Sequence, residues 1–548
     1  MEESRRFVSN LGVAVLLALD FPGILAAHVE SLSVPELAAA SPHVVVAVVE
    51  SRDTRWNAQH TLLTTDYTLR IEDRLRGQAP ERVSLSIPGG TLGNVTDETC
   101  LTVHLEPGAR YLLFLGDLDH PSLTPITGTH QGMFREIAGA SGNLAAAGES
   151  RTPLVLDGRP VRFSDLVAAV RPLAAKALPA PRPPAPPAGS LPAKTWDPTA
   201  APAPVRDSLP PLSSAGSSPQ PATGKFVYFE LANPPIVVNP LTDSEFSPWD
   251  QQEMAYWNLY AGDLFRVSAT PTSTWAYGNG ISDIVGFPDD KQMMAQFGYG
   301  WGDFPQGVLA VTFDRRIDGV VVEGDVAFSP LKRWTLDDVE GMSSAAPYSF
   351  KDVALHELGH VWGLEHPWET QHVTWDSVMN YRLKRYYVVE LFADDAAAVR
   401  KAFPSGRALR DGLISSYITK SALFDLPDYL PALPSISTVR AGGSFSLTGP
   451  IKIENPGTVP LASPTVEVYL APERLSLEGA VLLKRARAQG RVAVGGTLKV
   501  GLGSLRVPPN TQAGTYYLAF YLRDPKDVYQ GNNGAWSNED VTVTVTSR

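Results

Sequence analysis

One short stretch of the chain has the residue types and spacing of a catalytic metal site: His356-Glu357-Leu-Gly-His360-Val-Trp-Gly363-Leu-Glu-His366. On a helix, His356 and His360 stand one turn apart, so both imidazoles project from one face at a separation that a tetrahedral zinc ion bridges. We expect the helix to end at Gly363, because a residue without a Cβ atom enters the left-handed conformation at little cost. The turn then brings back His366 as a third ligand.

Glu357 is placed to act on a water molecule rather than on the metal itself. It lies about 100° round the helix from His356, close enough to touch metal-bound water without being a ligand. Three protein nitrogens leave the fourth position to water, as in catalytic zinc sites, whereas structural sites have four protein ligands. Zinc lowers the pKa of bound water to about 7, and Glu357 would accept its proton and later pass it to a leaving amine. The stretch therefore predicts zinc-dependent hydrolysis.

The alternative is a chance pattern on an ordinary helix. A lone His-Glu-x-x-His is common enough to leave that alternative open. All five fixed positions together should arise by chance in about one of 100,000 sequences of this composition, which favours the metal site.

The same motif, followed by Ser377-Val378-Met379-Asn380-Tyr381, resembles the metzincin clan of zinc endopeptidases, whose long motif and methionine turn it matches position for position. The resemblance implies that Met379 forms the apolar floor beneath the metal and that Glu357 is the general base. It also implies three zinc ligands, which are His356, His360 and His366.

Tyr381 is a second candidate catalytic residue. It matches astacin-like and serralysin-like members, in which this tyrosine can reach the zinc or the transition-state oxyanion. The alternative is an aromatic side chain packed in the wall of the substrate pocket.

Composition limits the other function classes. The chain has 548 residues, 44% of them hydrophobic, and we expect about three or four domains. A net charge of −12 and the lack of a long basic cluster argue against nucleic acid as a partner. A single cysteine excludes an intramolecular disulfide framework.

Residues 1–28 have the outline of a signal peptide, with Arg5 and Arg6 before the apolar run Leu11–Leu19 and the small pair Ala26-Ala27. The alternative is a frayed N-terminal helix. The run is too short to span a bilayer, and no other stretch is long enough. The sequence therefore predicts a secreted protein, extracellular or periplasmic, without a membrane span.

Residues 29–170 are expected to form an all-β, barrel-like domain. Strands are expected at 43–49, 61–71, 83–87 and 111–115, separated by turns. The order of elements faintly resembles the oligosaccharide/oligonucleotide-binding barrel of tissue inhibitors of metalloproteinases, with no motif behind the likeness. The domain would then be a propeptide or internal inhibitor, and the alternative is a neutral accessory module. Cys100 could bind zinc in a latent form, but its neighbours favour an incidental buried thiol.

Residues 171–223 are rich in Pro, Ala and Ser and read as a semi-rigid linker. Such a spacer is also accessible to proteolysis. We therefore consider activation by removal of residues 28 to roughly 222.

Residues 224–415 are expected to form an α+β catalytic domain. The expected order is a strand at 226–229, a helix from Ser247, strands at 279–285, 307–313 and 320–328, the zinc helix, and a last helix at 394–402. This order resembles that of the metzincin clan, in which the edge strand of the sheet lies antiparallel to an extended substrate. Four carboxylates around these strands suggest either a calcium site or a solvated acidic edge; they are Asp314, Asp318, Glu323 and Asp325.

Residues 435–548 contain strands at steady intervals and predict a β-sandwich. The segment Glu454–Gly457, with the later Gly531–Asn533, resembles the immunoglobulin-like cell-adhesion-related domain of bacterial surface proteins. The aromatic run 516–521 could bind a cell-surface or matrix ligand, and the alternative is a spacer whose aromatic residues are half core.

Two functions remain. The first is a secreted zinc endopeptidase that cleaves proteins or peptides; the second is a cell-surface adhesion or binding protein that carries a degenerate protease domain. Glu357 separates them, because an inactive homologue commonly loses the base while it keeps the fold. The chain has the base and all three histidines, which favours the enzyme.

Overall fold

The structure is a computed structural model. It describes residues 34–118, 124–139, 142–149, 153–156, 159–176, 230–231, 236–240, 247–262, 264–267, 275–301, 308–337, 347–364, 377–379, 391–404, 406–416 and 432–547, together with Leu32, Arg151, Phe304 and His366. The predicted signal peptide, nearly all of the predicted linker, the predicted strand 226–229 and Tyr381 lie outside these residues. In the part that is described, no helix is both long and apolar enough to cross a membrane.

The N-terminal domain is built on a six-stranded antiparallel sheet in the order β3-β2-β1-β6-β7-β8. Its strands are β1 (His43–Trp56), β2 (Leu63–Arg76), β3 (Arg82–Pro88), β6 (Arg110–Leu115), β7 (Met133–Ile137) and β8 (Leu144–Ala147). The four predicted strands are thus confirmed, and β1 and β2 extend beyond the predicted bounds. Because β3 and β8 are not paired among the described residues, the closed barrel stays a prediction.

Both faces of this sheet are covered, which explains the unbroken apolar run of β1. Val44 and Val46 pack with helices α2 (Val34–Ala40) and α3 (Phe163–Ala174), while Val45 and Val49 belong to a second cluster on the other face. Burial of Leu173 and Ala174 carries α3 past residue 170, where the sequence analysis ended the domain. A short ribbon of β9 (Val155–Leu156) and β10 (Arg159–Pro160) precedes α3.

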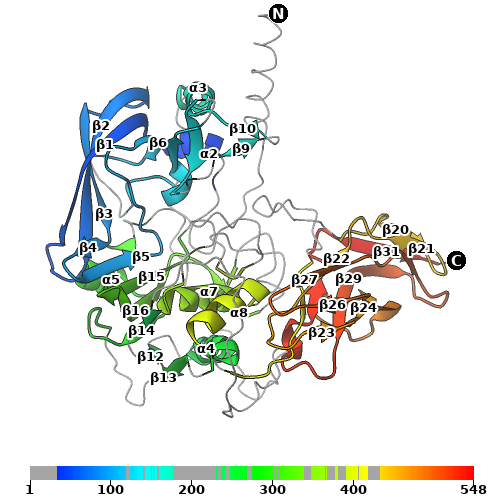
Figure 1. Ribbon diagram of the computed structural model, residues 1–548. Helices are drawn as coiled ribbons and strands as arrows, with labels where there is room; N and C mark the ends of the chain where they lie inside the picture. The colour runs from blue at the N-terminus through cyan, green and yellow to red at the C-terminus, as the bar shows by residue number, and fades with distance from the viewer. Residues whose placement is uncertain are drawn as a thin grey trace, which may run out of the picture.

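The region predicted to be catalytic contains an eight-stranded sheet in the order β13-β12-β14-β16-β15-β5-β4, with β11 beside β16. Its own strands are β11 (Glu230–Leu231), β12 (Ile236–Pro240), β13 (Phe265–Val267), β14 (Ser282–Val285), β15 (Ala310–Ile317) and β16 (Val320–Phe328). β15 and β16 form an antiparallel hairpin, whereas the other pairs among these strands are parallel. The last two strands, β4 (Gly90–Leu92) and β5 (Val95–Thr99), come from the N-terminal domain, and Figure 1 shows them lying against β15.

Helices cover both faces of this sheet. One face packs against α4 (Ser247–Ala261), α7 (Phe350–Val361) and α8 (Ala393–Ala402), which share a single apolar core. The other face carries α5 (Asp290–Phe297), through Met293 and Phe297. The sequence analysis did not predict α5; it is short and is set by a capping box at Asp289. The small ribbon of β17 (Trp334–Thr335) and β18 (Tyr348–Ser349) leads into α7.

Two further sheets make up the C-terminal region and share one apolar core. The first contains β20 (Thr438–Arg440), β31 (Thr542–Thr546), β29 (Gly514–Arg523), β24 (Thr465–Ala471) and β25 (Val481–Arg487), with β30 (Gly534–Trp536) beside β29. The second contains β19 (Leu413–Ile414), β22 (Ile451–Glu454) and β27 (Thr497–Val500). Two short ribbons complete the region, β21 (Ser444–Ser446) with β28 (Ser504–Arg506) and β23 (Leu461–Ala462) with β26 (Arg491–Val492). Because β19 pairs with β22, residues that the sequence analysis gave to the catalytic domain belong to this sheet.

The catalytic and C-terminal regions are fastened together by buried contacts. Tyr529 packs in the apolar core of the catalytic region, with its ring 4.7 Å from that of Tyr256. Tyr260 donates a hydrogen bond to the buried carboxyl of Asp411. The carboxyl of Asp527 lies beside Asp411 and accepts the backbone N–H of Gly412 at 3.0 Å. Burial, together with the neighbouring Asp411, raises the pKa of Asp527 to about 8.

This junction should weaken as the pH rises. Because the pKa of Asp527 is higher in the folded chain than the value of about 3.9 in an unfolded one, its contribution to stability is complete below about pH 4 and is lost as the pH rises through about 8. We expect the free energy of unfolding to fall by about 2 kcal/mol between about pH 6 and 8. Urea titrations followed by tryptophan fluorescence should show this slope in the wild type and in the exposed control Asp53→Asn. Asp527→Asn should make it shallower by about that amount, leaving the part that comes from other buried carboxyls such as Asp395, whose pKa burial raises to about 7. An unchanged slope would contradict the assignment.

Candidate metal centre

Helix α7 carries the metal-binding motif and is buried along its whole length. It begins after Ser349, whose hydroxyl accepts the backbone N–H of Asp352 at 3.3 Å. Trp257 of α4 donates its indole N–H to the carbonyl of Leu355 at 2.9 Å. On the other side, Gly324 of β16 lies so close that a Cβ atom there would be 2.9 Å from the Cα of Val361. The helix is therefore held firmly between the sheet and α4.

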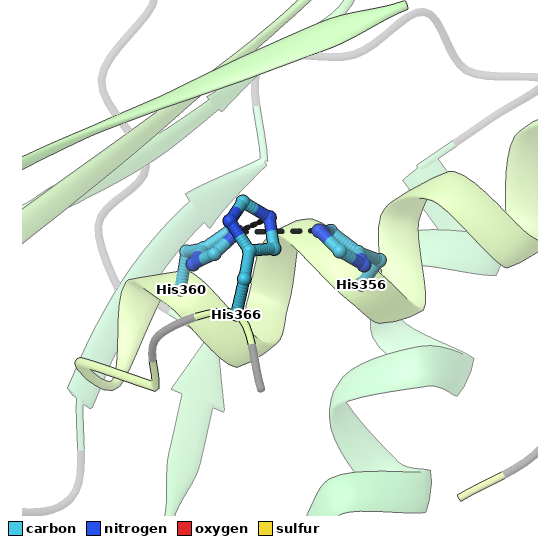
Figure 2. A group of neighbouring side chains, drawn as sticks. All are labelled: His356, His360 and His366. Carbon is cyan, nitrogen blue, oxygen red and sulfur yellow. Dashed lines mark hydrogen bonds between the residues drawn. The ribbon is translucent and has the colours of Figure 1, made fainter. Parts of the chain in front are cut away.

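The structure brings the three predicted histidines together (Figure 2). The Nε2 atom of His360 lies 3.1 Å from that of His356 and 3.1 Å from that of His366. All three side chains are buried. Two nitrogens at about 2.0–2.1 Å from one tetrahedral zinc ion are about 3.3 Å apart, so this group fits such an ion.

Backbone carbonyls fix the tautomers of two of these rings. The Nδ1 atom of His356 lies 2.7 Å from the carbonyl of Val378, and that of His360 lies 2.7 Å from the carbonyl of Leu364. A carbonyl only accepts, so each Nδ1 must carry the hydrogen and each Nε2 must present a lone pair. Two lone pairs facing each other at 3.1 Å are what a bound cation stabilises.

Gly363 ends the helix and turns the chain, as the sequence predicted. Its φ is 87°, and its N–H donates to the carbonyl of His360 at 2.7 Å. Leu364 then donates to the carbonyl of Gly359 at 3.0 Å, and its own carbonyl meets His360. The same turn therefore returns His366 to the group and orients the ring of His360.

Glu357 is fully buried beside this group, and a residue that the sequence analysis missed holds it. The hydroxyl of Thr312 on β15 donates to Glu357 Oε2 at 2.5 Å. Strand periodicity places Thr312 on the face of β15 that looks toward α7, but local sequence gives no signal that it meets Glu357.

A second missed residue, Asp395 of α8, holds the methionine turn. Its carboxyl accepts the hydroxyl of Ser377 at 2.6 Å and the N–H groups of Val378 at 2.8 Å and Phe392 at 3.0 Å. Burial raises the pKa of Asp395 to about 7. Because Val378 also accepts from His356, Asp395 fixes the carbonyl that orients this histidine.

The four predicted calcium ligands do not form a metal-binding group among the described residues, where the histidine group alone meets the geometric requirement. Glu323 accepts three backbone N–H groups from residues 278–280, and Asp325 accepts from Trp275 and from the N–H of Asp283. Asp314 pairs with Arg316 at 2.7 Å. Calcium is not supported. The alternative prediction, a solvated acidic edge, is wrong for Asp314, Glu323 and Asp325, because all three carboxylates are buried. Of the four residues, Asp318 alone is exposed.

Cys100 is buried and lies near the metal centre. It lines a small cavity together with Glu98, His360 and Gly363.

Met379 packs directly on α7, and Gly359 makes room for it. A Cβ atom at Gly359 would lie 2.2 Å from the sulfur of Met379. Gly359→Ala should therefore destabilise the protein by about 1–3 kcal/mol through overpacking. In a Met379→Ala background the same substitution should cost much less, because the sulfur is gone. Urea denaturation of the four proteins measures this coupling, and strictly additive costs would contradict the contact.

The matrixin family model matches residues 293–404, which include α7, the methionine turn and α8. Among curated proteins, none matches the chain. The family match and the histidine group together support a metzincin-type, zinc-binding peptidase domain in this part of the chain.

Proposed function

We propose that this protein is a secreted zinc endopeptidase that hydrolyses peptide bonds in proteins or peptides. The observation that carries the proposal is the convergence of three imidazole Nε2 atoms beside a buried glutamate, within the segment that matches the matrixin family. An inactive relative commonly loses the glutamate, and this chain keeps it. Export rests on the sequence of residues 1–28 alone.

His356, His360 and His366 would hold the zinc ion, which supplies Lewis acidity and makes water nucleophilic near neutral pH. Glu357 accepts the proton of the attacking water and delivers it to the amine of the leaving product. Thr312 holds the carboxylate of Glu357 by its hydrogen bond, and Met379 packs against Gly359 of the helix that carries His356 and His360. Tyr381 would stabilise the oxyanion; it lies outside the described residues.

Metal binding should depend on the histidine group alone. The purified chain should bind about one equivalent of zinc, because three convergent nitrogens and a solvent site complete a catalytic coordination sphere. His356→Ala should lose the metal after dialysis, whereas the exposed His60→Ala should keep it. Zinc content is measured by atomic emission. Full retention by His356→Ala would contradict the assignment.

Catalysis should require Glu357 without affecting zinc content. We expect Glu357→Gln to lower peptide hydrolysis by about 10²–10⁴-fold, the usual contribution of a general base. The assay uses a proteome-derived peptide library. It is run with the intact chain and again after limited proteolysis has removed the residues that precede Gly224. The exposed Glu50→Gln variant is the control and should cleave like the wild type. Cleavage that persists with a zinc chelator, or equal cleavage by Glu357→Gln, would exclude the mechanism.

A further inference from the structure

The edge of the catalytic sheet nearest the metal centre is occupied by the chain's own N-terminal domain. Strand β5 runs antiparallel to β15, with Val95 opposite Ile317 and Thr99 opposite Phe313. Backbone hydrogen bonds continue past both ends of this ladder. Asp318 donates to the carbonyl of Asn94 at 2.8 Å, and Cys100 donates to the carbonyl of Thr312 at 3.2 Å. Since β16 covers the other side of β15, both of its edges are paired.

This pairing reaches the catalytic residues. Thr312, whose carbonyl accepts the N–H of Cys100, is also the residue whose hydroxyl holds Glu357. Thr99 and Cys100 line the same small cavity as His360. An extended peptide binds a sheet by adding a strand to an exposed edge. The edge beside Glu357 is that of β15, and residues 94–100 already occupy it from Thr312 to Ile317.

Buried charges anchor the inserted strand. Arg315 of β15 makes two hydrogen bonds to the fully buried carboxylate of Asp97, at 2.7 and 2.9 Å. Tyr277 of the catalytic region also donates to Asp97, at 3.2 Å, and Arg316 lies 2.7 Å from Glu98. Because desolvation offsets most of the attraction in buried ion pairs, these pairs fix the register of β5 on β15 more than they add to its net stability.

Apolar contacts close the same interface. Leu62 and Leu101 of the N-terminal domain are fully buried in a cluster with residues of α5 and of β15, among them Phe297 and Phe313. The strand is therefore part of an extensive interface and cannot leave β15 without exposing this cluster to water.

We propose that residues 94–100 hold the peptidase latent by occupying the edge of β15 that an extended substrate must use, and that hydrolysis requires this strand to leave. The obstruction is the paired backbone and does not depend on the thiol of Cys100. The inference rests on the proposed function, because it takes the edge beside Glu357 to be the substrate site.

The pairing pattern defines a matched pair of variants. Hydrogen-bonded and non-hydrogen-bonded pairs alternate along an antiparallel ladder. Asn94 and Cys100 each form a backbone hydrogen bond with the residue opposite them, Asp318 and Thr312. Thr96 is an even number of positions from both, so it also belongs to a hydrogen-bonded pair, and its N–H is directed at β15. Thr91 lies opposite Thr96 on the outer strand β4, so its own N–H is directed away from β5. Proline therefore removes an inter-domain hydrogen bond at Thr96 and no ladder bond at Thr91.

The first test compares full-length proteins. Thr96→Pro should hydrolyse the peptide library ~5–150-fold faster than the wild type, because one lost ladder bond weakens the docked strand by about 1–3 kcal/mol. Thr91→Pro and Cys100→Ser should remain as slow as the wild type. Equal rates for Thr96→Pro and the wild type would overturn the proposal. A rate for Cys100→Ser as high as that for Thr96→Pro would also overturn it, since the thiol would then hold the latent state.

The second test locks the strand in place. Val95 and Ile317 form a non-hydrogen-bonded pair, in which the side chains are closest and suit a disulfide. Val95→Cys/Ile317→Cys is combined with Thr96→Pro and Cys100→Ser. The oxidised protein should be latent, and reduction with a phosphine should restore the fast rate. A fast rate in the oxidised protein would show that the strand need not move.

A binding measurement keeps this inference separate from the proposed function. The locked protein also receives Glu357→Gln, and a fluorescent peptide of residues 93–102, with serine at position 100, is titrated by anisotropy. The reduced protein should bind the peptide, and the oxidised protein should not. Equal binding by both overturns the latency proposal whether or not hydrolysis is seen. A clear difference in binding, with no hydrolysis by any variant that keeps Glu357, contradicts the proposed function instead.

Discussion

The close packing of α7 between the sheet and α4 is the constraint on which the rest of the site depends. A helix that is buried on all sides can carry histidine and glutamate only if each polar atom has a partner. The carbonyls of Val378 and Leu364 meet two of the imidazoles, and Thr312 meets the glutamate. These partners come from the methionine turn, the turn after Gly363 and β15. The packing of one helix therefore fixes the position of three other segments.

The catalytic region shares its structure with both of its neighbours. Its sheet continues into β5 and β4 of the N-terminal domain, and its main core receives Tyr529 from the C-terminal region. Inter-domain contacts of this kind resemble the interior of one domain more than a tethered arrangement. Asp411 and Asp527 are buried at the junction between this region and the C-terminal region. The described parts of the three regions therefore pack as one unit.

Local patterns predicted the parts of this fold that local interactions determine. The helix end at Gly363, the bounds of β16 and the helix at α8 all follow from periodicity and capping. The role of β5 could not be predicted in this way. Its sequence, Val-Thr-Asp-Glu-Thr, has no apolar alternation, and its partner β15 is more than two hundred positions away in the chain. The same reason applies to Thr312 and Asp395, whose functions depend on contacts between segments that are distant in sequence.

The composition of β5 makes sense for a strand that binds firmly and can still be released. A strand of apolar residues would pair with β15 through the hydrophobic effect and, once released, would expose an aggregation-prone edge. Asp97 and Glu98 instead meet Arg315 and Arg316, and buried ion pairs contribute more to register than to net stability, because desolvation offsets most of the attraction. The charges therefore fix which backbone atoms pair, while the apolar contacts of Leu62 and Leu101 supply the binding energy. Any event that removes those apolar contacts leaves the charged strand better solvated in water than on the sheet.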